Sequence, residues 1–186
     1  MNESIVLNNL LNLIDNHSLN ITEYDVFNFL KIRTRWPIRY SWNQPSVEII
    51  TQFNHVSQSN FFDSDGYLIY DEWIKYYKMG FTTIISNVLD LNGELRDLQN
   101  KILKYTGTKI NGNFYFSSGS LDHRVSFDSH THNYHVILKP IYGKSKWKIS
   151  EKEFETSEKS FIIKSGEYHQ VTECGTKKLS LTLNIL

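Results

Sequence analysis

Apolar residues in the first half of the chain recur every three or four positions, which is the spacing of helices with one buried face. This spacing predicts four helices, whose apolar faces are formed by Ile5, Leu10, Leu13 and Ile14; by Val26, Phe27 and Leu30; by Trp73, Ile74 and Tyr77; and by Leu95, Leu98, Ile102 and Leu103. Thr22 and Asp71 are predicted N-caps of the second and third helices, because their side-chain oxygens can accept hydrogen bonds from a free first turn. Gly80 and Gly107 indicate where the third and fourth helices end.

From Asn113 onward apolar and polar residues alternate in short runs between glycine turns, a pattern typical of β-strands. The runs are NFYFSS, the histidine-rich segment, VILKPIYG, KWKI, SFIIK and KLSLTLNIL, and a further β-rich run, FTTII, lies earlier at residues 81–85. The stretch 31–62 is aromatic and irregular, with prolines at 37 and 45. Short strands with tight turns favour a sandwich or barrel of the jelly-roll kind. We therefore predict a mainly β protein with an α-helical N-terminal part.

Composition and charge exclude several classes of function. Of the 186 residues, 40% are hydrophobic and 14% aromatic, which is enough for one domain with a substantial core. Twenty basic and twenty acidic residues cancel, so no overall field favours nucleic acid or an anionic membrane. Cys174 is the only cysteine, which excludes an intrachain disulfide and a cysteine-based zinc site. The N-terminus does not resemble a secretory signal and no apolar run approaches the roughly 20 residues of a membrane span, so we expect a cytoplasmic protein.

Three histidines, His130, His132 and His135, fall within one short polar stretch, FDSHTHNYHV. Residues two apart on a strand face the same side, so His130 and His132 would project together and could bind one ion. The best third ligand is His169, which follows an apolar strand and a glycine turn in IIKSGEYHQV. Three neutral imidazoles can hold Fe(II), Mn, Ni, Cu or Zn and leave positions for substrate or oxygen. The alternative is that the histidines are only exposed or hydrogen-bonded. His135 would face the opposite side of a regular strand, so we expect it to contact a metal ligand from outside the coordination sphere, to face substrate or to be exposed.

From about residue 73 to the end, the chain resembles the JmjC-type cupins, particularly the ribosomal-protein hydroxylase branch of the 2-oxoglutarate oxygenases. The segments that carry the resemblance are GFTTIISNV before a helix and NFYFSSG, then HTHNYHVILKPIYGKSKW, then SFIIKSGEYHQV followed by KKLSLTLNI. Their order and spacing extend over most of the second half of the chain. The resemblance implies a double-stranded β-helix (cupin or jelly-roll) barrel over residues 76–186, with a mostly helical region, residues 1–75, packed on it.

Gly143 and Trp147 set the register of this resemblance and place His130 on the first metal ligand of the family. His132 stands where these hydroxylases have an aspartate ligand. Replacing a carboxylate by an imidazole raises the net charge of the site by one and removes a hard oxygen donor. A set of three histidines is more similar to that of thiol dioxygenases and several other cupins.

Ser145 is the second departure from the family. The matching family position is a Lys or Arg that pairs with the far carboxylate of 2-oxoglutarate, and a serine cannot supply that charge-assisted bond, worth about 1.5–3 kcal/mol. Lys144 and Lys146 flank it but face the other way on a regular strand, unless a local bulge turns one inward. The use of 2-oxoglutarate is therefore left open.

Positions that contact the cosubstrate in this family are polar residues on two strands. Here the candidate cosubstrate-binding residues are Tyr115, Ser117, Ser145, Lys146, Thr182 and Asn184, and Ser180 shares the face of the last two. Ordinary alternation on half-exposed strands is the alternative interpretation. Tyr142 and Trp147 are expected in the core or in the pocket wall.

Two other motifs favour ordinary surface structure. In NFFDSDGYLIYDEW, Asp63, Asp65, Gly66 and Glu72 match positions of an EF-hand loop, but Phe61 occupies the first ligand position. A polar turn is therefore favoured over calcium binding. RTRWPIRY has three arginines among aromatic residues, and a solvated basic loop is favoured over a site for phosphate or an acidic partner.

Three functions fit these features. The favoured one is a mononuclear iron oxygenase of JmjC-like cupin fold, with His130, His132 and His169 holding Fe(II), which oxidises a peptide, amino-acid or natural-product substrate with O2, with 2-oxoglutarate as an optional cosubstrate. The second is a three-histidine cupin enzyme independent of 2-oxoglutarate, such as a dioxygenase or an isomerase. The third is a non-catalytic cupin that binds a small molecule. Each of the three functions is compatible with a monomer or a homodimer.

Overall fold

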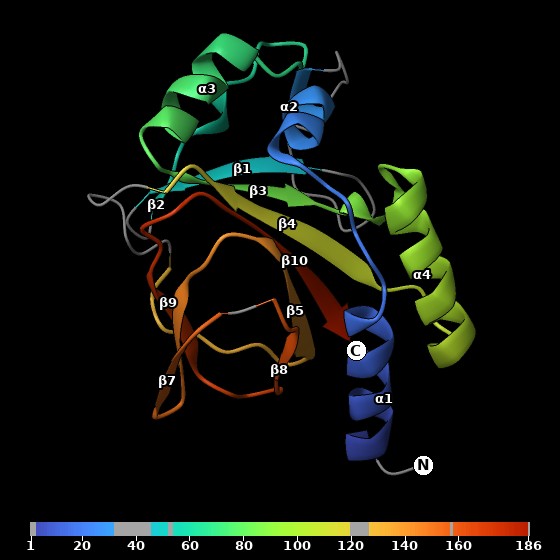
Figure 1. The fold of residues 1–186 in the computed structure, drawn as a ribbon. Helices are drawn as coiled ribbons and strands as arrows, with labels where there is room; N and C mark the ends of the chain where they lie inside the picture. The colour runs from blue at the N-terminus through green and yellow to red at the C-terminus, as the bar shows by residue number, and fades with distance from the viewer. Residues whose placement is uncertain (1–2, 32–45, 52–53, 120–126, 157, 186) are drawn as a thin grey trace.

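The computed structural model describes residues 3–31, 46–51, 54–119, 127–156 and 158–185, which form a β-barrel with helices on its outside (Figure 1). The helices are α1 (Glu3–Asp15), α2 (Glu23–Lys31), α3 (Tyr70–Lys78) and α4 (Gly93–Thr106), with short helical turns at Gln58–Asn60 and Val88–Asp90. The strands are β1 (Ser46–Thr51), β2 (Asn54–His55), β3 (Thr82–Ser86), β4 (Asn111–Ser117), β5 (His135–Tyr142), β6 (Lys146–Ile149), β7 (Lys152–Glu155), β8 (Phe161–Ile163), β9 (His169–Glu173) and β10 (Lys178–Ile185).

Two antiparallel sheets form the walls of the barrel. The larger sheet has seven strands in the order β2-β1-β3-β4-β10-β5-β8, and the smaller has three in the order β7-β6-β9. In Figure 1, α2 and α3 cover one face of the larger sheet, and β7 and β9 of the smaller sheet lie on the other side. The mainly β architecture with helices in the N-terminal half agrees with the prediction from sequence periodicity.

Strand β10 shows how one sequence pattern builds both faces of the larger sheet. Leu179, Leu181 and Leu183 are fully buried in the core that the helices cover. Lys178 and Ser180, which alternate with them, face the cavity inside the barrel and are also largely buried. Because successive strand residues point to opposite faces, this strand supplies the core on one side and the cavity wall on the other.

Helix α1 is attached to strand β5 near both of its ends. His135 Nε2 lies 2.9 Å from Glu3 Oε1 at the start of the helix. At the other end, Lys139 Nζ donates to the carbonyl oxygen of Ile14 at 2.9 Å and to that of Asp15 at 3.4 Å. The last carbonyl groups of a helix have no partner within it, so a lysine there is favourable. These contacts hold α1 against the barrel.

Strand β1 lies within the range 31–62, which the sequence pattern left irregular. It pairs antiparallel with β3, and Val47, Ile49 and Ile50 are buried. The run is short and its partner is distant in sequence, so local alternation did not reveal it. The basic segment RTRWPIRY lies outside the described residues. β1, from the predicted helical region 1–75, belongs to the larger sheet of the barrel. The predicted boundary between a helical region and a barrel at residues 75 and 76 stays a prediction.

Asp71 lies inside the first turn of α3 and does not cap it, because the N-cap residue before the helix makes no side-chain cap bond. The preceding loop is organised by Asp63, whose Oδ1 accepts hydrogen bonds from the backbone N–H groups of Asp65 at 3.0 Å and Tyr67 at 2.8 Å. Phe61, at the first position of the EF-hand-like pattern, is fully buried. The loop is a polar turn of the kind that the sequence favoured.

Helix α2 begins with a reciprocal cap between Thr22 and Asp25. The backbone N–H of Thr22 donates to Asp25 Oδ2 at 2.8 Å, and the backbone N–H of Asp25 donates to Thr22 Oγ1 at 3.3 Å. This is the geometry of a capping box, which satisfies two otherwise unpaired donors. The structure thus confirms the N-cap predicted at Thr22.

Thr22→Ala is expected to lower the free energy of unfolding by about 0.5–2 kcal/mol at neutral pH. The hydrogen bonds from the Thr22 side chain and backbone lower the pKa of Asp25. They therefore stabilise the fold above the usual pKa of an aspartate and are lost as the pH falls through the lowered value. Urea unfolding should show a difference between parent and variant that shrinks in acid; equal stability at neutral pH would contradict the capping role.

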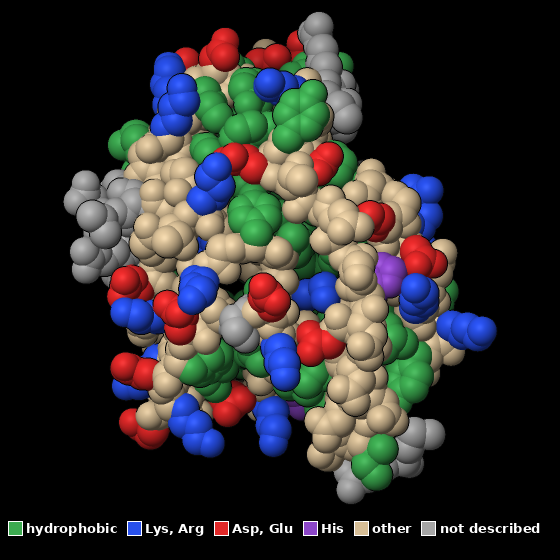
Figure 2. Space-filling view, in the orientation of Figure 1, with side chains coloured by type: hydrophobic (Ala, Val, Ile, Leu, Met, Phe, Trp, Pro, Cys, Tyr) green, Lys and Arg blue, Asp and Glu red, His purple; other side chains and the backbone are tan. Residues whose placement is uncertain are grey.

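The surface carries no extended region of one charge on the face shown in Figure 2, where basic and acidic side chains are interspersed. This agrees with the balance of twenty basic and twenty acidic residues. No helix in the described part of the chain is long and apolar enough to cross a membrane.

Candidate metal centre and its cavity

The histidine-rich segment is not the regular strand that the sequence predicted. Residues 128–134 are irregular apart from a single antiparallel bridge between His130 and His169. His130 and His169 exchange backbone hydrogen bonds of 3.0 and 3.2 Å, and the N–H of Gly166 donates to the carbonyl oxygen of His132 at 2.8 Å. The segment and the start of β9 are therefore fixed side by side by backbone bonds rather than by a continuous strand pairing.

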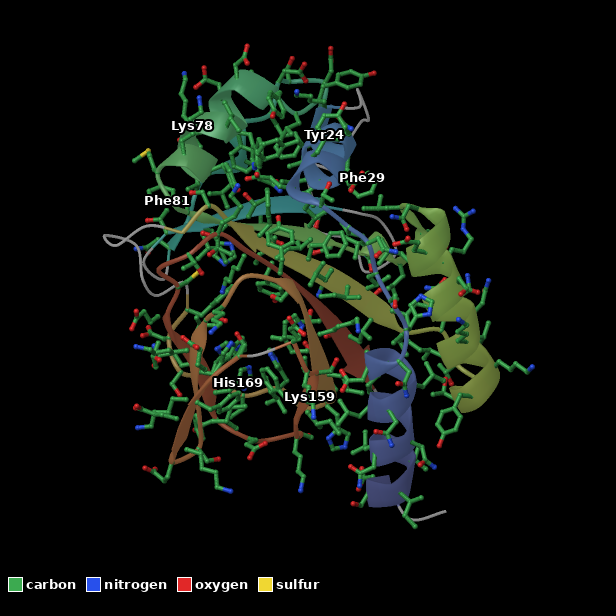
Figure 3. The ribbon with its side chains drawn as sticks, viewed as in Figure 1. Tyr24, Phe29, Lys78, Phe81, Lys159 and His169 are labelled. Carbon is green, nitrogen blue, oxygen red and sulfur yellow. The ribbon has the colours of Figure 1, made fainter. Side chains whose placement is uncertain are left out.

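The side chains of His130, His132 and His169 converge inside the barrel. The ring centroid of His130 lies 4.4 Å from that of His169 and 4.9 Å from that of His132, and the last two lie 4.9 Å apart. One ring nitrogen from each residue lies within 4.8 Å of the others. Figure 3 shows His169 on the barrel side of the larger sheet, opposite the helices that carry Tyr24 and Lys78.

Backbone carbonyl groups fix which ring nitrogen faces a ligand in two of the histidines. Nδ1 of His130 lies 2.8 Å from the carbonyl oxygen of Asp128, and Nδ1 of His169 lies 3.0 Å from that of Glu167. A carbonyl oxygen can only accept, so each Nδ1 carries the proton and Nε2 keeps its lone pair. Metal-binding histidines typically have this arrangement, in which the second nitrogen is held by a carbonyl group. The third ring, His132, stacks on Tyr134 at 4.9 Å.

Burial favours the neutral form of His132 and His169. Burial, together with the adjacent His169 and His130, lowers the pKa of His132 to about 4. Burial also lowers the pKa of His169, against an opposing effect of the hydrogen bond to Glu167. Neutral imidazole is the form that binds metal ions. Metal–nitrogen bonds of about 2.0–2.1 Å place two ligand nitrogens no more than about 4 Å apart, so the three residues fit one divalent ion after a small closure of the rings.

The three histidines line a cavity of about 330 Å³ inside the barrel. Much of its wall is apolar or aromatic, from Phe127, Tyr134, Val136, Leu138, Trp147, Ile163 and Val171. A polar strip crosses the same cavity, formed by Asn113 and Tyr115 of β4 and by Lys178, Ser180, Thr182 and Asn184 of β10. Glu48, His55 and Thr82 lie at the side formed by β1 to β3.

Three of the six predicted cosubstrate residues line this cavity: Tyr115, Thr182 and Asn184. Ser117 does not, because it lies at the end of β4, where its Oγ donates to the carbonyl oxygen of Gly80 at 3.0 Å. Its parity with Tyr115 was correct, but the strand has passed the cavity by that point. The face that β10 presents to the cavity begins at Lys178, a residue that the sequence analysis left out although it shares the parity of Ser180, Thr182 and Asn184.

Ser145 and Lys146 also lie outside the lining of the cavity. Ser145 Oγ accepts a hydrogen bond of 2.9 Å from Trp147 Nε1 and packs against Thr156. A register shift does occur between Lys146 and Trp147, but it leaves Lys146 outside, where its Nζ donates to Glu173 at 2.7 Å. The predicted bulge is therefore present, but it does not turn Lys146 into the cavity.

His135 stands apart from the cluster of three. Its Nδ1 accepts a hydrogen bond of 3.1 Å from the backbone N–H of Ser165, so its proton is on Nε2, which faces Glu3. The residue connects α1 to the barrel and contributes no nitrogen to the cluster. His135 therefore neither faces the cavity as a substrate contact nor is freely exposed; it is hydrogen-bonded on both ring nitrogens.

Among solved structures, the ribosomal oxygenase YcfD from Escherichia coli in complex with cobalt and succinic acid is similar to this chain, with a TM-score of 0.61 and 11% sequence identity over 92% of this chain and 45% of YcfD. The complex of YcfD with cobalt and 2-oxoglutarate has the same TM-score and 12% identity. This chain has the fold of YcfD, a double-stranded β-helix. The fold class predicted from the sequence, a double-stranded β-helix barrel with an α-helical N-terminal part, is thereby confirmed.

The likeness to YcfD extends to the fold and not to the whole protein. The chain spans 45% of the length of YcfD. No protein-family model and no curated protein matches the sequence. At 11% identity the reaction, metal and substrate of this protein do not follow from those of YcfD, so they are argued from the residues of the cavity.

Proposed function

We propose that this chain is a mononuclear metal-dependent oxygenase that holds Fe(II) with His130, His132 and His169, uses 2-oxoglutarate, and hydroxylates a peptide side chain, an amino acid or a natural product. The observation that carries the proposal is the convergence of three imidazoles on one cavity inside the barrel. The YcfD complexes with cobalt, succinic acid and 2-oxoglutarate, on the same fold, support it.

Iron bound to three imidazoles would supply the chemistry of O2 activation, because such a ligand set leaves coordination positions for small ligands. The protein contributes position and exclusion of water. Val136, Leu138 and Ile163 make the wall beside the histidines apolar, which limits water near the reacting groups. A volume of about 330 Å³ is at the lower end of the roughly 300–1,000 Å³ typical of ligand sites. It fits a small cosubstrate together with a small molecule or one inserted side chain.

The second candidate is a three-histidine cupin enzyme that does not use 2-oxoglutarate. Two observations favour it. His132 offers an imidazole at the position where the JmjC-type hydroxylases have a carboxylate ligand. Ser145, at the position of their basic cosubstrate-binding residue, is hydrogen-bonded to Trp147. The two candidates share the metal site and differ in whether a 2-oxo acid is consumed.

Protein reconstituted with Fe(II) without oxygen is expected to bind one iron per chain and to develop a metal-to-ligand charge-transfer band when 2-oxoglutarate is added. On exposure to oxygen it should convert 2-oxoglutarate to succinate and CO2. This conversion should be slow when the substrate to be hydroxylated is absent. Metal analysis, anaerobic absorption spectra and succinate assay measure these three steps. Protein that denatures before the measurements is excluded by a circular dichroism spectrum of each sample.

The outcomes separate the candidates. Iron bound without a band, followed by substrate oxidation without succinate, would support the enzyme independent of 2-oxoglutarate. A ligand bound equally well with and without metal would support the non-catalytic binding protein. Absence of bound metal in folded protein would contradict both enzyme proposals.

A further inference from the structure

Lys178 is a buried lysine in the wall of the metal cavity. It is the first residue of β10, is 5% exposed and shares the cavity face with Ser180 and Thr182. Lysine is rarely buried unless its ammonium has a partner. Within the described parts of the chain, no hydrogen bond or ion pair is formed by Lys178 Nζ. A buried ammonium without a protein partner requires an anion from elsewhere.

Lys178 lines the cavity, and its ammonium is not sealed in the core. The fully enclosed side-chain atoms without a partner, among the described residues, are Ser46 Oγ, Tyr142 Oη and Ser160 Oγ, and Lys178 Nζ is not one of them. Lys178 is also the only Lys or Arg in the described lining of the cavity. A ligand in the cavity therefore meets this one ammonium.

The described protein groups around the cavity do not supply the missing anion. The one carboxylate in the described lining is that of Glu48, whose Oε2 lies 3.1 Å from His55 Nδ1. Two carboxylates on the neighbouring strands are paired with exposed lysines: Glu155 with Lys144 at 3.1 Å and Glu173 with Lys146 at 2.7 Å.

Lys178 lies next to Ser145, the residue at which the sequence analysis noted a missing positive charge. A small internal cavity is lined by both residues. The turn before Ser145 also approaches β10 closely, because a Cβ on Gly143 would lie 2.7 Å from the Cα of Lys178. The positive charge absent at position 145 is thus present at Lys178, the first residue of β10.

We propose that Lys178 binds the far carboxylate of a 2-oxo dicarboxylic acid in this cavity, in place of a basic residue at position 145. The assignment rests on the proposed function for the other end of the ligand, which the three-histidine site would hold through its 2-oxo acid group. The hydroxyl group of Ser180 lies on the same face of β10 and offers a further donor to the ligand. Lys178 then selects a dicarboxylate over a 2-oxo acid that ends in a methyl group.

The test compares two ligands that differ in the carboxylate. Metal-loaded protein is titrated anaerobically with 2-oxoglutarate and with pyruvate, which is a 2-oxo acid without the far carboxylate, and dissociation constants are measured by calorimetry. The parent is expected to bind 2-oxoglutarate about 10- to 100-fold more tightly than pyruvate, the range of one charge-assisted hydrogen bond. Lys178→Met should lose this preference and keep the pyruvate affinity, whereas a general structural defect would weaken both.

Two further variants complete the design. Lys178→Arg keeps the charge and should retain most of the preference. Lys146→Met removes an exposed lysine on the neighbouring strand and should bind both ligands like the parent. An unchanged preference in Lys178→Met, or no preference in the parent, would overturn the assignment. Metal content is measured on every sample: if the parent binds no metal, the proposed function fails and this assignment with it, whereas bound metal without the preference removes only the role of Lys178.

Discussion

His169→Ala and His130→Ala are each expected to lower the affinity for Fe(II) by more than about 100-fold. Even the loss of a group that hydrogen-bonds to a metal ligand lowers metal affinity by about 10- to 100-fold, and these variants lose a ligand itself. Each substitution leaves only two imidazoles of the cluster in which one nitrogen per residue lies within 4.8 Å of the others. Iron bound per chain, measured after anaerobic reconstitution and removal of free metal, should fall from one to near zero.

His135→Ala is the matched control, because it removes a histidine from the same stretch of sequence whose ring faces Glu3 instead of the cluster. This variant should bind iron like the parent and lose only some attachment of α1. The assignment of the site is wrong if His130→Ala and His169→Ala retain the iron stoichiometry of the parent. Equal loss of iron in all three variants would instead indicate a general effect on folding.

The convergence of His130, His132 and His169 could be predicted from the sequence, but the route to it differed. Strand parity was expected to align His130 with His132, whereas the segment is irregular and only His130 forms a bridge. The rings meet because Gly166 and His169 fix the facing backbone. Spacing thus identified the residues, and the local backbone that positions them depended on pairing with a distant segment.

The cavity lining could be predicted only in part, for reasons visible on two strands. Alternation on β10 indicated a polar face correctly, since Ser180, Thr182 and Asn184 all line the cavity. Alternation does not reveal where a strand enters or leaves the cavity, so Lys178 was missed and Ser117 was included. β1 was missed for a related reason: its partner β3 is far away in sequence, and a short strand has little local signal.

The helices hold the outer face of the larger sheet through one aromatic cluster centred on Trp73. Its side chain is fully buried, and its Nε1 donates to Thr83 Oγ1 at 3.0 Å. The ring stacks with Tyr77 at a centroid distance of 5.5 Å and lies at 76° to the ring of Phe27, 5.7 Å away. It also stacks with Phe116 of β4 at 6.4 Å, so the cluster joins α2 and α3 to the strands behind the cavity.

Trp73→Ala is expected to reduce the free energy of unfolding by about 3–5 kcal/mol, the usual cost of removing a large aromatic side chain from a core. This is a large part of the roughly 5–15 kcal/mol that stabilises a typical domain. The midpoint of urea unfolding should therefore fall strongly. Tyr24→Ala, on the adjoining helix and 69% exposed, should change stability by less than about 0.5 kcal/mol. If the two variants unfold at the same urea concentration, the aromatic cluster does not hold the helices to the barrel. A large difference would show that packing of the helices on the outer face of the larger sheet stabilises the fold.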